Sequence, residues 1–155
     1  MKKKFFGTDG IRGTFEEFPI TTSFFYELTK AIKFTFRNLK KVIIGLDTRE
    51  SSNLIELDII SGFKKMKVEC NSLGVVSTPI LSFATKKFNY DLGIMISASH
   101  NPYKDNGIKI FDKKGEKLSD NDELKIEKNI NLTKQNHTHS LQIEKKKVSF
   151  FEYEN

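Results

Sequence analysis

The sequence predicts an α/β fold: a three-layer α/β/α domain built on a mixed sheet that is mostly parallel. Short apolar runs typical of buried strands alternate with segments in which apolar residues recur at helical spacing. Three of the strand-like runs end in polar turns, as expected where the strands of a parallel sheet lead into crossover helices. The length of 155 residues fits about one domain with a substantial core.

The first half of the chain holds two expected helices separated by a strand. Residues 21–38 carry apolar side chains at helical spacing after a pair of threonines, which commonly cap helices. The Val/Ile run at 41–46 predicts a buried strand. Residues 51–66 again place apolar side chains on one helical face, with Ser51 or Ser52 as the expected cap.

The second half of the chain continues the alternation. Residues 68–76 and 91–96 are strand-like, and the helix expected between them, at 79–88, begins with a proline, which suits its first turn. A short strand is expected at 107–111, followed by a turn and by a polar helix at 119–129 that opens on a Ser/Asp cap. No internal repeat is visible in the sequence.

Composition and charge argue against several classes of protein. The net charge is +6, but the lysines are scattered among acidic residues, which favours a solvated surface over a nucleic-acid groove. The single cysteine, Cys70, excludes an internal disulfide framework, and its apolar neighbours predict a buried structural thiol. No apolar run is long enough to span a membrane, and the first residues lack the apolar segment of a signal peptide. We therefore expect a cytoplasmic protein without nucleic-acid or membrane partners.

The most informative stretch is the polar turn Ser97–Pro102, which follows a buried strand directly. A serine on such a turn lies at the carboxyl edge of the sheet, where open α/β folds bind ligands. Ser99 is therefore interpreted as a nucleophile or a group carrier. The turns Asp47–Arg49 and Ser77–Pro79 also follow strands, so we expect all three turns to converge at one edge.

Phosphoryl transfer fits Ser99 better than hydrolysis does. A serine hydrolase needs a base oriented toward its serine, but His100 is adjacent in sequence and no Gly-x-Ser-x-Gly elbow is present. Phosphoryl transfer depends instead on positioning and on cations near the phosphate oxygens. The cationic residues close to the turns are Arg12, Arg49, Lys104 and Lys109.

Other polar positions near the turns leave alternatives open. Glycines at 7, 10 and 13 let the backbone approach a ligand closely, although a flexible amino-terminal turn would also explain them. Asp9 and Asp47 are candidate metal ligands or phosphate-loop anchors, but aspartates in turns more often cap helices or bond to their own backbone.

Together, these residues resemble four motifs of the α-D-phosphohexomutase family, in the same order and at plausible spacing. The opening segment Phe6–Gly13 is similar to that of the bacterial phosphoglucosamine mutase branch. The other motifs are the Gly-x-Asp-Thr-Arg turn at Gly45–Arg49, the strand end at Gly74–Pro79, and the serine loop at Ser97–Pro102, continued by Asp105–Lys109.

The resemblance implies an isomerase that moves a phosphoryl group between the 6- and 1-positions of a hexosamine phosphate. Ser99 would carry the group as a phosphoserine, a sugar bisphosphate would be the intermediate, and the serine phosphate would bind Mg²⁺. The opening motif favours glucosamine 6-phosphate and glucosamine 1-phosphate as the substrate pair. A phosphomannomutase or a phosphoglucomutase would perform the same chemistry on another sugar.

The resemblance also gives roles to residues around the serine. Arg12 and Lys109 would assist proton transfer or contact phosphate, and Lys109 is favoured for proton transfer because neighbours readily shift the pKa of a lysine. His100 would take part in catalysis, and Asn101 would bind phosphate; both would also orient the loop. Arg49 would contribute to phosphate binding.

The family enzymes have four domains, and residues 1–140 resemble only the first of them. Residues 141–155 would begin a linker to a second domain, and the aromatic end of the chain suggests a cut at that point. The Asp-rich loop that would complete the Mg²⁺ site is missing, so we expect the fragment to be inactive without the remaining mutase domains. The alternative is a non-catalytic stand-alone domain that binds a partner chain or a phosphorylated ligand.

Overall fold

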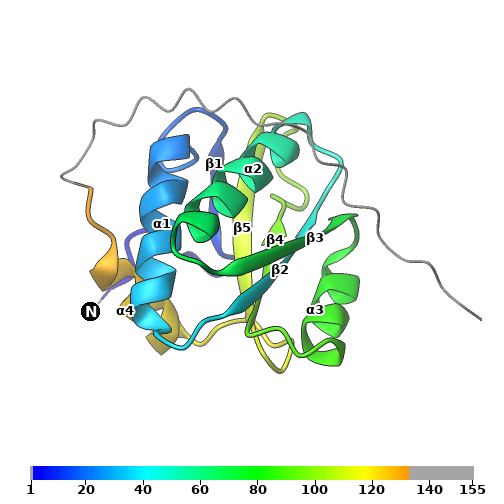
Figure 1. Cartoon of the computed structure of the whole chain (residues 1–155). Helices are drawn as coiled ribbons and strands as arrows, with labels where there is room; N and C mark the ends of the chain where they lie inside the picture. The colour runs from blue at the N-terminus through cyan, green and yellow to red at the C-terminus, as the bar shows by residue number, and fades with distance from the viewer. Residues whose placement is uncertain (1, 133–155) are drawn as a thin grey trace, which may run out of the picture.

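A five-stranded mixed sheet forms the centre of the molecule, with helices against both of its faces (Figure 1). The computed structural model describes residues 2–132. The strand order is β1-β5-β4-β2-β3; β4, β2 and β3 are parallel, whereas β5 pairs antiparallel with both β4 and β1. The strands are β1 (Ile11–Thr14), β2 (Lys41–Leu46), β3 (Glu69–Val75), β4 (Leu92–Ile96) and β5 (Asp105–Asp112). The α/β/α prediction is confirmed.

The helices divide unequally between the two faces of the sheet. In the described part of the chain, α1, α2 and α4 cover one face and α3 alone lies on the other (Figure 1). The helices are α1 (Thr22–Thr35), α2 (Glu50–Lys65), α3 (Thr78–Lys87) and α4 (Asp120–Asn129). Within residues 2–132, α3 lies over β2, β4 and part of β5, so no described helix covers β1 on that face of the sheet.

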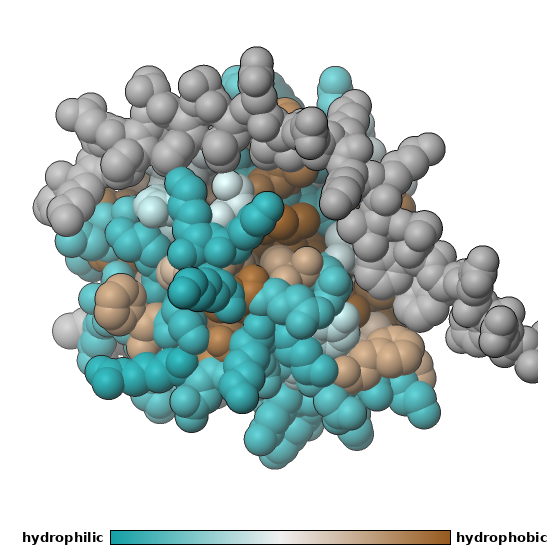
Figure 2. Space-filling model, viewed as in Figure 1, coloured by the Kyte–Doolittle hydropathy of each residue, from teal (hydrophilic) through white to brown (hydrophobic). Residues whose placement is uncertain are grey.

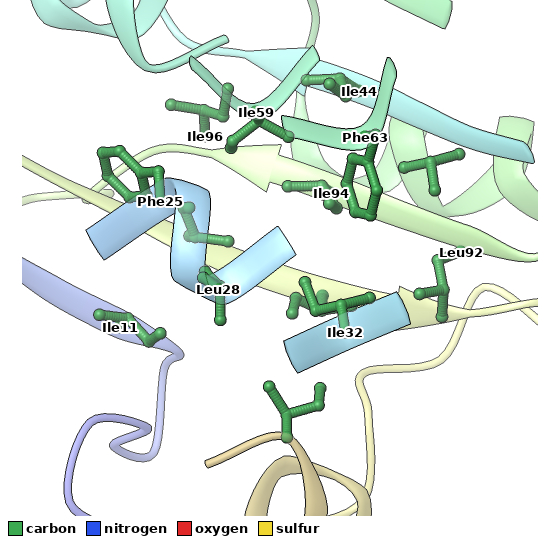
Figure 3. Close-up of a cluster of buried hydrophobic side chains, with 14 of the residues drawn as sticks. Ile11, Phe25, Leu28, Ile32, Ile44, Ile59, Phe63, Leu92, Ile94 and Ile96 are labelled. Atoms are coloured by element: carbon green, nitrogen blue, oxygen red, sulfur yellow. The ribbon is translucent and has the colours of Figure 1, made fainter. Parts of the chain in front are cut away.

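Alternation along the central strands explains why both faces are buried. On β2, Val42 and Ile44 point into the larger core, whereas Ile43 points toward α3. Figure 3 shows the larger core, where Phe25, Leu28 and Ile32 of α1 face the branched side chains of the sheet. The labelled sheet residues in that view are Ile11, Ile44, Leu92, Ile94 and Ile96, while Ile59 and Phe63 come from α2. Packing in this core fixes β2 and β4, the strands that lead into the polar turns at Asp47–Arg49 and Ser97–Pro102.

Most elements lie where the sequence predicts them, and two helix caps are confirmed in detail. Thr21 Oγ1 accepts a hydrogen bond from Phe24 N at 3.3 Å, and Ser119 Oγ accepts one from Asp122 N at 3.1 Å. The cap predicted for α2 is wrong: its N-cap is Arg49, whose side chain makes no capping bond. Ser51 and Ser52 instead lie inside the first turn and are buried.

One strand is not expected from the sequence. β1 is four residues long and contains an arginine and a glycine, so it has no apolar periodicity of its own. It exists because it pairs antiparallel with β5, placing Ile11 opposite Ile108 and Arg12 opposite Gly107. The amino-terminal motif is therefore the edge of the sheet and not a free turn.

The segment before β1 is held by the last helix. The Glu127 carboxylate of α4 accepts hydrogen bonds from the backbone N–H groups of Lys4, Phe5 and Phe6 at 2.7, 2.7 and 2.8 Å. These bonds fix the direction in which the chain enters the Gly7–Gly13 motif. The predicted linker at 141–155 lies outside the described residues.

The face of the molecule in Figure 2 is mostly polar, with apolar side chains visible between the charged ones. Two of the exposed apolar residues, Ile80 and Phe83, lie on the outer side of α3, the helix that stands alone on its face. No helix among residues 2–132 combines the length and the apolar character needed to cross a membrane.

Candidate functional site

Ser99 lies at the carboxyl end of β4 and is exposed. Its backbone has φ 53°, in the left-handed region that residues with a side chain adopt rarely and at some cost. The Ser99 N–H donates to Ser97 Oγ at 3.0 Å, but its hydroxyl makes no hydrogen bond to any residue in 2–132. The turn therefore presents a free hydroxyl to solvent, as expected for a residue that reacts.

The loop that carries Ser99 is closed by backbone hydrogen bonds. Asn101 N donates to Ala98 O at 3.0 Å, and Asp105 N donates to Pro102 O at 2.9 Å. Before the loop, Ser97 N donates to Gly107 O at 2.9 Å, which joins the end of β4 to β5. Two successive turns thus hold the segment between the strands in one conformation.

Arg12 reaches this loop from β1. Its Nη1 donates to Asn101 Oδ1 at 2.9 Å, and Asn101 Nδ2 in turn donates to Asp105 Oδ2 at 3.1 Å. The Arg12 Nε is buried and has no hydrogen-bond partner among the described residues. The guanidinium therefore lies beside the serine loop and keeps part of its donor capacity free of protein acceptors.

Lys109 joins the same group of charges through Asp9. The Asp9 carboxylate lies 3.8 Å from both Arg12 Nη2 and Lys109 Nζ. Because Asp9 is 56% exposed, these long ion pairs each contribute little to stability. They do place two cations on the face of the sheet that α3 leaves uncovered.

Gly10 explains how Asp9 arrives between these two cations. It has φ 88°, and a Cβ at this position would collide with the backbone oxygen of Ile108 on β5. The glycine expected to approach a ligand therefore approaches the neighbouring strand. The sequence leaves open whether Asp9 binds a metal, anchors a phosphate loop or caps a helix. In the structure it forms a charge cluster with Arg12 and Lys109.

Arg49 is buried, and its guanidinium faces the backbone of the serine loop. All five of its N–H groups are matched by acceptors of the protein. We expected Arg49 to help bind phosphate, but in this structure it has no N–H left to donate to one. The expected role of Arg49 in phosphate binding stays a prediction, and the bonds in this structure give Arg49 a role within the loop.

Asp47 fixes Arg49 from the other side. Its carboxylate accepts from Arg49 Nε at 2.9 Å, Arg49 N at 3.0 Å and Ser52 Oγ at 2.8 Å. Burial raises the pKa of Asp47, but hydrogen bonds from Ser52, the Arg49 backbone, Ser97 and the Arg49 side chain outweigh burial and hold that pKa below its usual value. Asp47 therefore acts as an anchor inside the protein.

A buried amide extends this network into β5. Asn106 is fully buried, and its Nδ2 donates to Ser51 Oγ at 2.8 Å and to Ser52 Oγ at 3.0 Å. Sequence reasoning did not select Asn106, Ser97 or Asp105 as site residues. The sequence offers one indication of their importance: they are polar residues inside or beside the strand and loop motifs.

The remaining predicted residues lie around the loop without tight contacts. His100 is exposed, and no side-chain bond ties it to the described residues. Lys104 is also exposed, while its backbone oxygen accepts from Phe15 N at 3.0 Å. Of the three turns expected to converge, those of Asp47 and Ser99 are joined through Arg49. The turn at Ser77 follows the neighbouring strand, but its exposed side chain makes no capping bond.

The described residues do not form a metal site by themselves. Within 2–132, no group of three or more His, Cys, Asp or Glu side chains is placed to hold an ion. The Ser99 hydroxyl is a single neutral ligand, and the nearby carboxylate of Asp47 is already occupied by hydrogen bonds within the protein. Mg²⁺ therefore does not fit these residues without further ligands.

In chemical terms, the site is an exposed hydroxyl on a loop that Arg12 contacts, with Lys109 linked to Arg12 through the Asp9 carboxylate. Such an arrangement lacks the oriented base that a serine hydrolase needs, because no histidine contacts Ser99 in the described chain. It can stabilise charge on the oxygens of a group bound to Ser99.

Comparison with known proteins agrees with this arrangement. Residues 3–137 match the family model described as phosphoglucomutase/phosphomannomutase, alpha/beta/alpha domain I. The chain is 48% identical over 132 residues to a phosphoglucosamine mutase of Buchnera aphidicola, and 46% identical over 133 residues to one of Bartonella quintana. Each alignment covers 84% of this chain but 29% of the relative.

Solved structures give the same fold. A protein of Thermus thermophilus, provisionally described as a phosphomannomutase, superposes with a TM-score of 0.75 at 29% identity. That match covers 81% of this chain and 29% of the other. The family match extends over most of the chain and includes all of the serine loop, β1 and β5. The chain belongs to the phosphoglucomutase/phosphomannomutase family, of which it contains the α/β/α domain I.

Proposed function

We propose that this chain is the serine-bearing domain of a phosphosugar mutase that interconverts glucosamine 6-phosphate and glucosamine 1-phosphate. The observation that carries the proposal is the free, exposed Ser99 hydroxyl on a fixed loop beside Arg12. Relatives named phosphoglucosamine mutase, 43% to 48% identical, support the choice of sugar.

The proposed transfer begins with a phosphoryl group on Ser99. A sugar hydroxyl oxygen attacks the phosphorus, the bond between phosphorus and Ser99 Oγ breaks, and the hydroxyl proton ends on Oγ. The sugar is now a bisphosphate. After it turns in the site, Oγ attacks the other phosphate and recovers a phosphoryl group, while the leaving sugar oxygen takes back the proton.

The cations beside the loop supply the electrostatic part of this reaction. We assign phosphate contact to Arg12, and proton transfer to Lys109, which the same Asp9 carboxylate holds at 3.8 Å. Exposed His100 would meet the sugar or its phosphate, and Asn101 would keep Arg12 aligned through the 2.9 Å bond.

We further propose that turnover needs more chain than these residues. The chain spans 29% of the length of the curated relatives it matches, and residues 2–132 do not complete a metal site. The domain would contribute only the phosphate oxygen of Ser99 to Mg²⁺. The other ligands and the sugar-binding residues would come from the remaining mutase domains.

Mutase turnover tests this proposal directly. The chain is assayed alone and together with the remaining domains of a phosphoglucosamine mutase, with Mg²⁺ and a catalytic amount of glucosamine 1,6-bisphosphate. Product is expected only in the mixture, and Ser99→Ala abolishes it. Ser23→Ala, at an exposed serine of α1 outside the four motifs, is the matched control and retains activity. An active Ser99→Ala mixture would refute the assignment.

A binding domain without catalysis is the second candidate, favoured by the short span of the chain and the incomplete metal site. It predicts that glucosamine 6-phosphate or a partner chain binds with equal affinity to the wild type and to Ser99→Ala. It also predicts that no added domain produces turnover.

A further inference from the structure

The Arg49 side chain is the most completely bonded polar group near the site. It is 6% exposed, and its Nε donates to Asp47 at 2.9 Å. The four remaining N–H groups point to backbone carbonyls of one loop. These acceptors are Ser99 O at 2.9 Å, Asn101 O at 3.0 Å, Pro102 O at 2.6 Å and Asp105 O at 3.1 Å.

These carbonyls converge because the loop folds around the guanidinium. Carbonyl oxygens repel one another when they point to a common centre, so the loop requires a cation with several donors at that point. The first of the four belongs to Ser99, the residue with φ 53°. The bond to Ser99 O fixes the peptide plane that follows the reactive residue and so helps to keep its backbone left-handed.

A lysine could not replace Arg49 in this position. An ammonium group has three donors on a single atom, whereas the planar guanidinium has five donors spread over a fixed fork. Asp47 orients that fork through Nε, and Ser52 orients the Asp47 carboxylate at 2.8 Å. The alignment of the loop is therefore tied to the start of α2.

We propose that Arg49 is a positioning residue: it holds the Ser99 peptide in its left-handed conformation, aims Oγ at the phosphoryl group, and does not touch that group itself. The transfer reaction in this statement rests on the proposed function. The hydrogen bonds from Arg49 to the loop carbonyls, called the Arg49 clamp or the clamp below, do not rest on it. The clamp and the proposed function can therefore fail separately.

The first experiment compares Arg49→Lys with Arg37→Lys, a charge-conserving control at an exposed arginine. Phosphoryl transfer from glucosamine 1,6-bisphosphate to Ser99 is followed in the assembled mutase. We expect the maximal rate of Arg49→Lys to fall about 10²-fold with little change in KM, since misplacement of a reacting atom costs rate at a given occupancy. A raised KM with an unchanged rate would mean that Arg49 binds phosphate, and would overturn the proposal, as would no change in either.

Chemical rescue separates positioning from general loss of structure. In Arg49→Ala, guanidinium ion at a low, non-denaturing concentration is expected to restore part of the rate, whereas ammonium at equal ionic strength restores none. Failure of guanidinium to restore any rate in a folded variant would count against the clamp. If Arg49→Ala and Arg49→Lys do not fold, Asp47→Asn, which keeps Arg49 but weakens its anchor, takes their place in the rate measurement.

Amide hydrogen exchange tests the clamp without any reaction. In Arg49→Lys we expect faster exchange at Asn101 and Asp105, whose N–H groups close the loop, and unchanged exchange in β2 and β4. If wild-type Ser99 accepts no phosphate but this exchange pattern appears, the proposed function fails and the clamp stands. Unchanged exchange in the loop would overturn the clamp whatever the activity.

Discussion

Arg12 Nη1 donates to Asn101 Oδ1 at 2.9 Å across 89 residues of sequence. This bond joins the edge strand β1 to the loop that carries Ser99. Asn101 Nδ2 in turn donates to Asp105 Oδ2, and Thr14 Oγ1 of β1 donates to Asp105 Oδ1 at 3.2 Å. The amino-terminal motif and the serine motif are thus two halves of one hydrogen-bonded unit.

Asn101→Ala should loosen this unit. The substitution removes both side-chain bonds of Asn101, which we expect to lower the free energy of unfolding by about 1 kcal/mol. Phosphoryl transfer to Ser99 should slow, since Arg12 loses its alignment. Urea unfolding and the transfer assay measure the two effects. Asn38→Ala, at an exposed residue between α1 and β2, should leave both unchanged; equal behaviour of the two variants would show that the bond is unimportant.

The Asp47 carboxylate should make the free energy of unfolding depend on pH in the acid range. Its folded pKa is lowered, so its contribution is present above its unfolded pKa of about 3.9 and is lost as the pH falls through the folded pKa. Asp47→Asn should therefore be less stable than the wild type at pH 7, and the difference should close in strong acid. Urea unfolding from pH 7 downward measures it. A difference that stays constant across that range would contradict the hydrogen-bonded carboxylate.

Cys70 should be nearly inert to alkylation. Burial, together with the charge of Glu56, raises the pKa of its thiol to about 12. The thiolate fraction at pH 8 is then at least about 10³-fold below that of an ordinary cysteine. Iodoacetamide labelling followed by mass spectrometry should be slow in the folded chain and ordinary in urea. Cys70 is half-buried and not fully buried as the sequence predicts, so fast labelling of the folded chain would contradict the raised pKa.

Mg²⁺ binding should depend on the phosphate at Ser99. The chain without phosphate should give no saturable heat in a calorimetric titration with Mg²⁺, because residues 2–132 place no cluster of metal-ligating side chains. The chain carrying phosphoserine at position 99 should bind weakly. Equal binding by both forms would place the ion elsewhere.

The central strands and the helices could be predicted from the sequence because their signal is local. β2 at Lys41–Leu46 is an apolar run bounded by polar residues, and α4 starts at a serine that caps it. β1 could not be predicted in this way, since only its pairing with β5 makes it a strand. A strand at 107–111 is expected from the sequence, but the antiparallel direction of β5 has no local signal and is set by the loop before it.

The site residues also differ in whether their roles depend on local sequence or on contacts between distant segments. The position of Ser99 after a buried strand is local, and the structure places its side chain in solvent as expected. The role of Arg49 is not local, because its four loop acceptors lie 50 to 56 residues away. A sequence pattern indicates that an arginine is important there, but only the fold shows whether it faces a ligand or the backbone.

The residue that receives the transferred phosphate is the sharpest test of the proposed role of Ser99. The chain, combined with the remaining mutase domains, is incubated with glucosamine 1,6-bisphosphate and Mg²⁺, and phosphopeptides are mapped by mass spectrometry. Phosphate is expected on Ser99 alone, with none after Ser99→Ala. Phosphate on Ser97 or His100 in the wild type, with Ser99 unmodified, would contradict it.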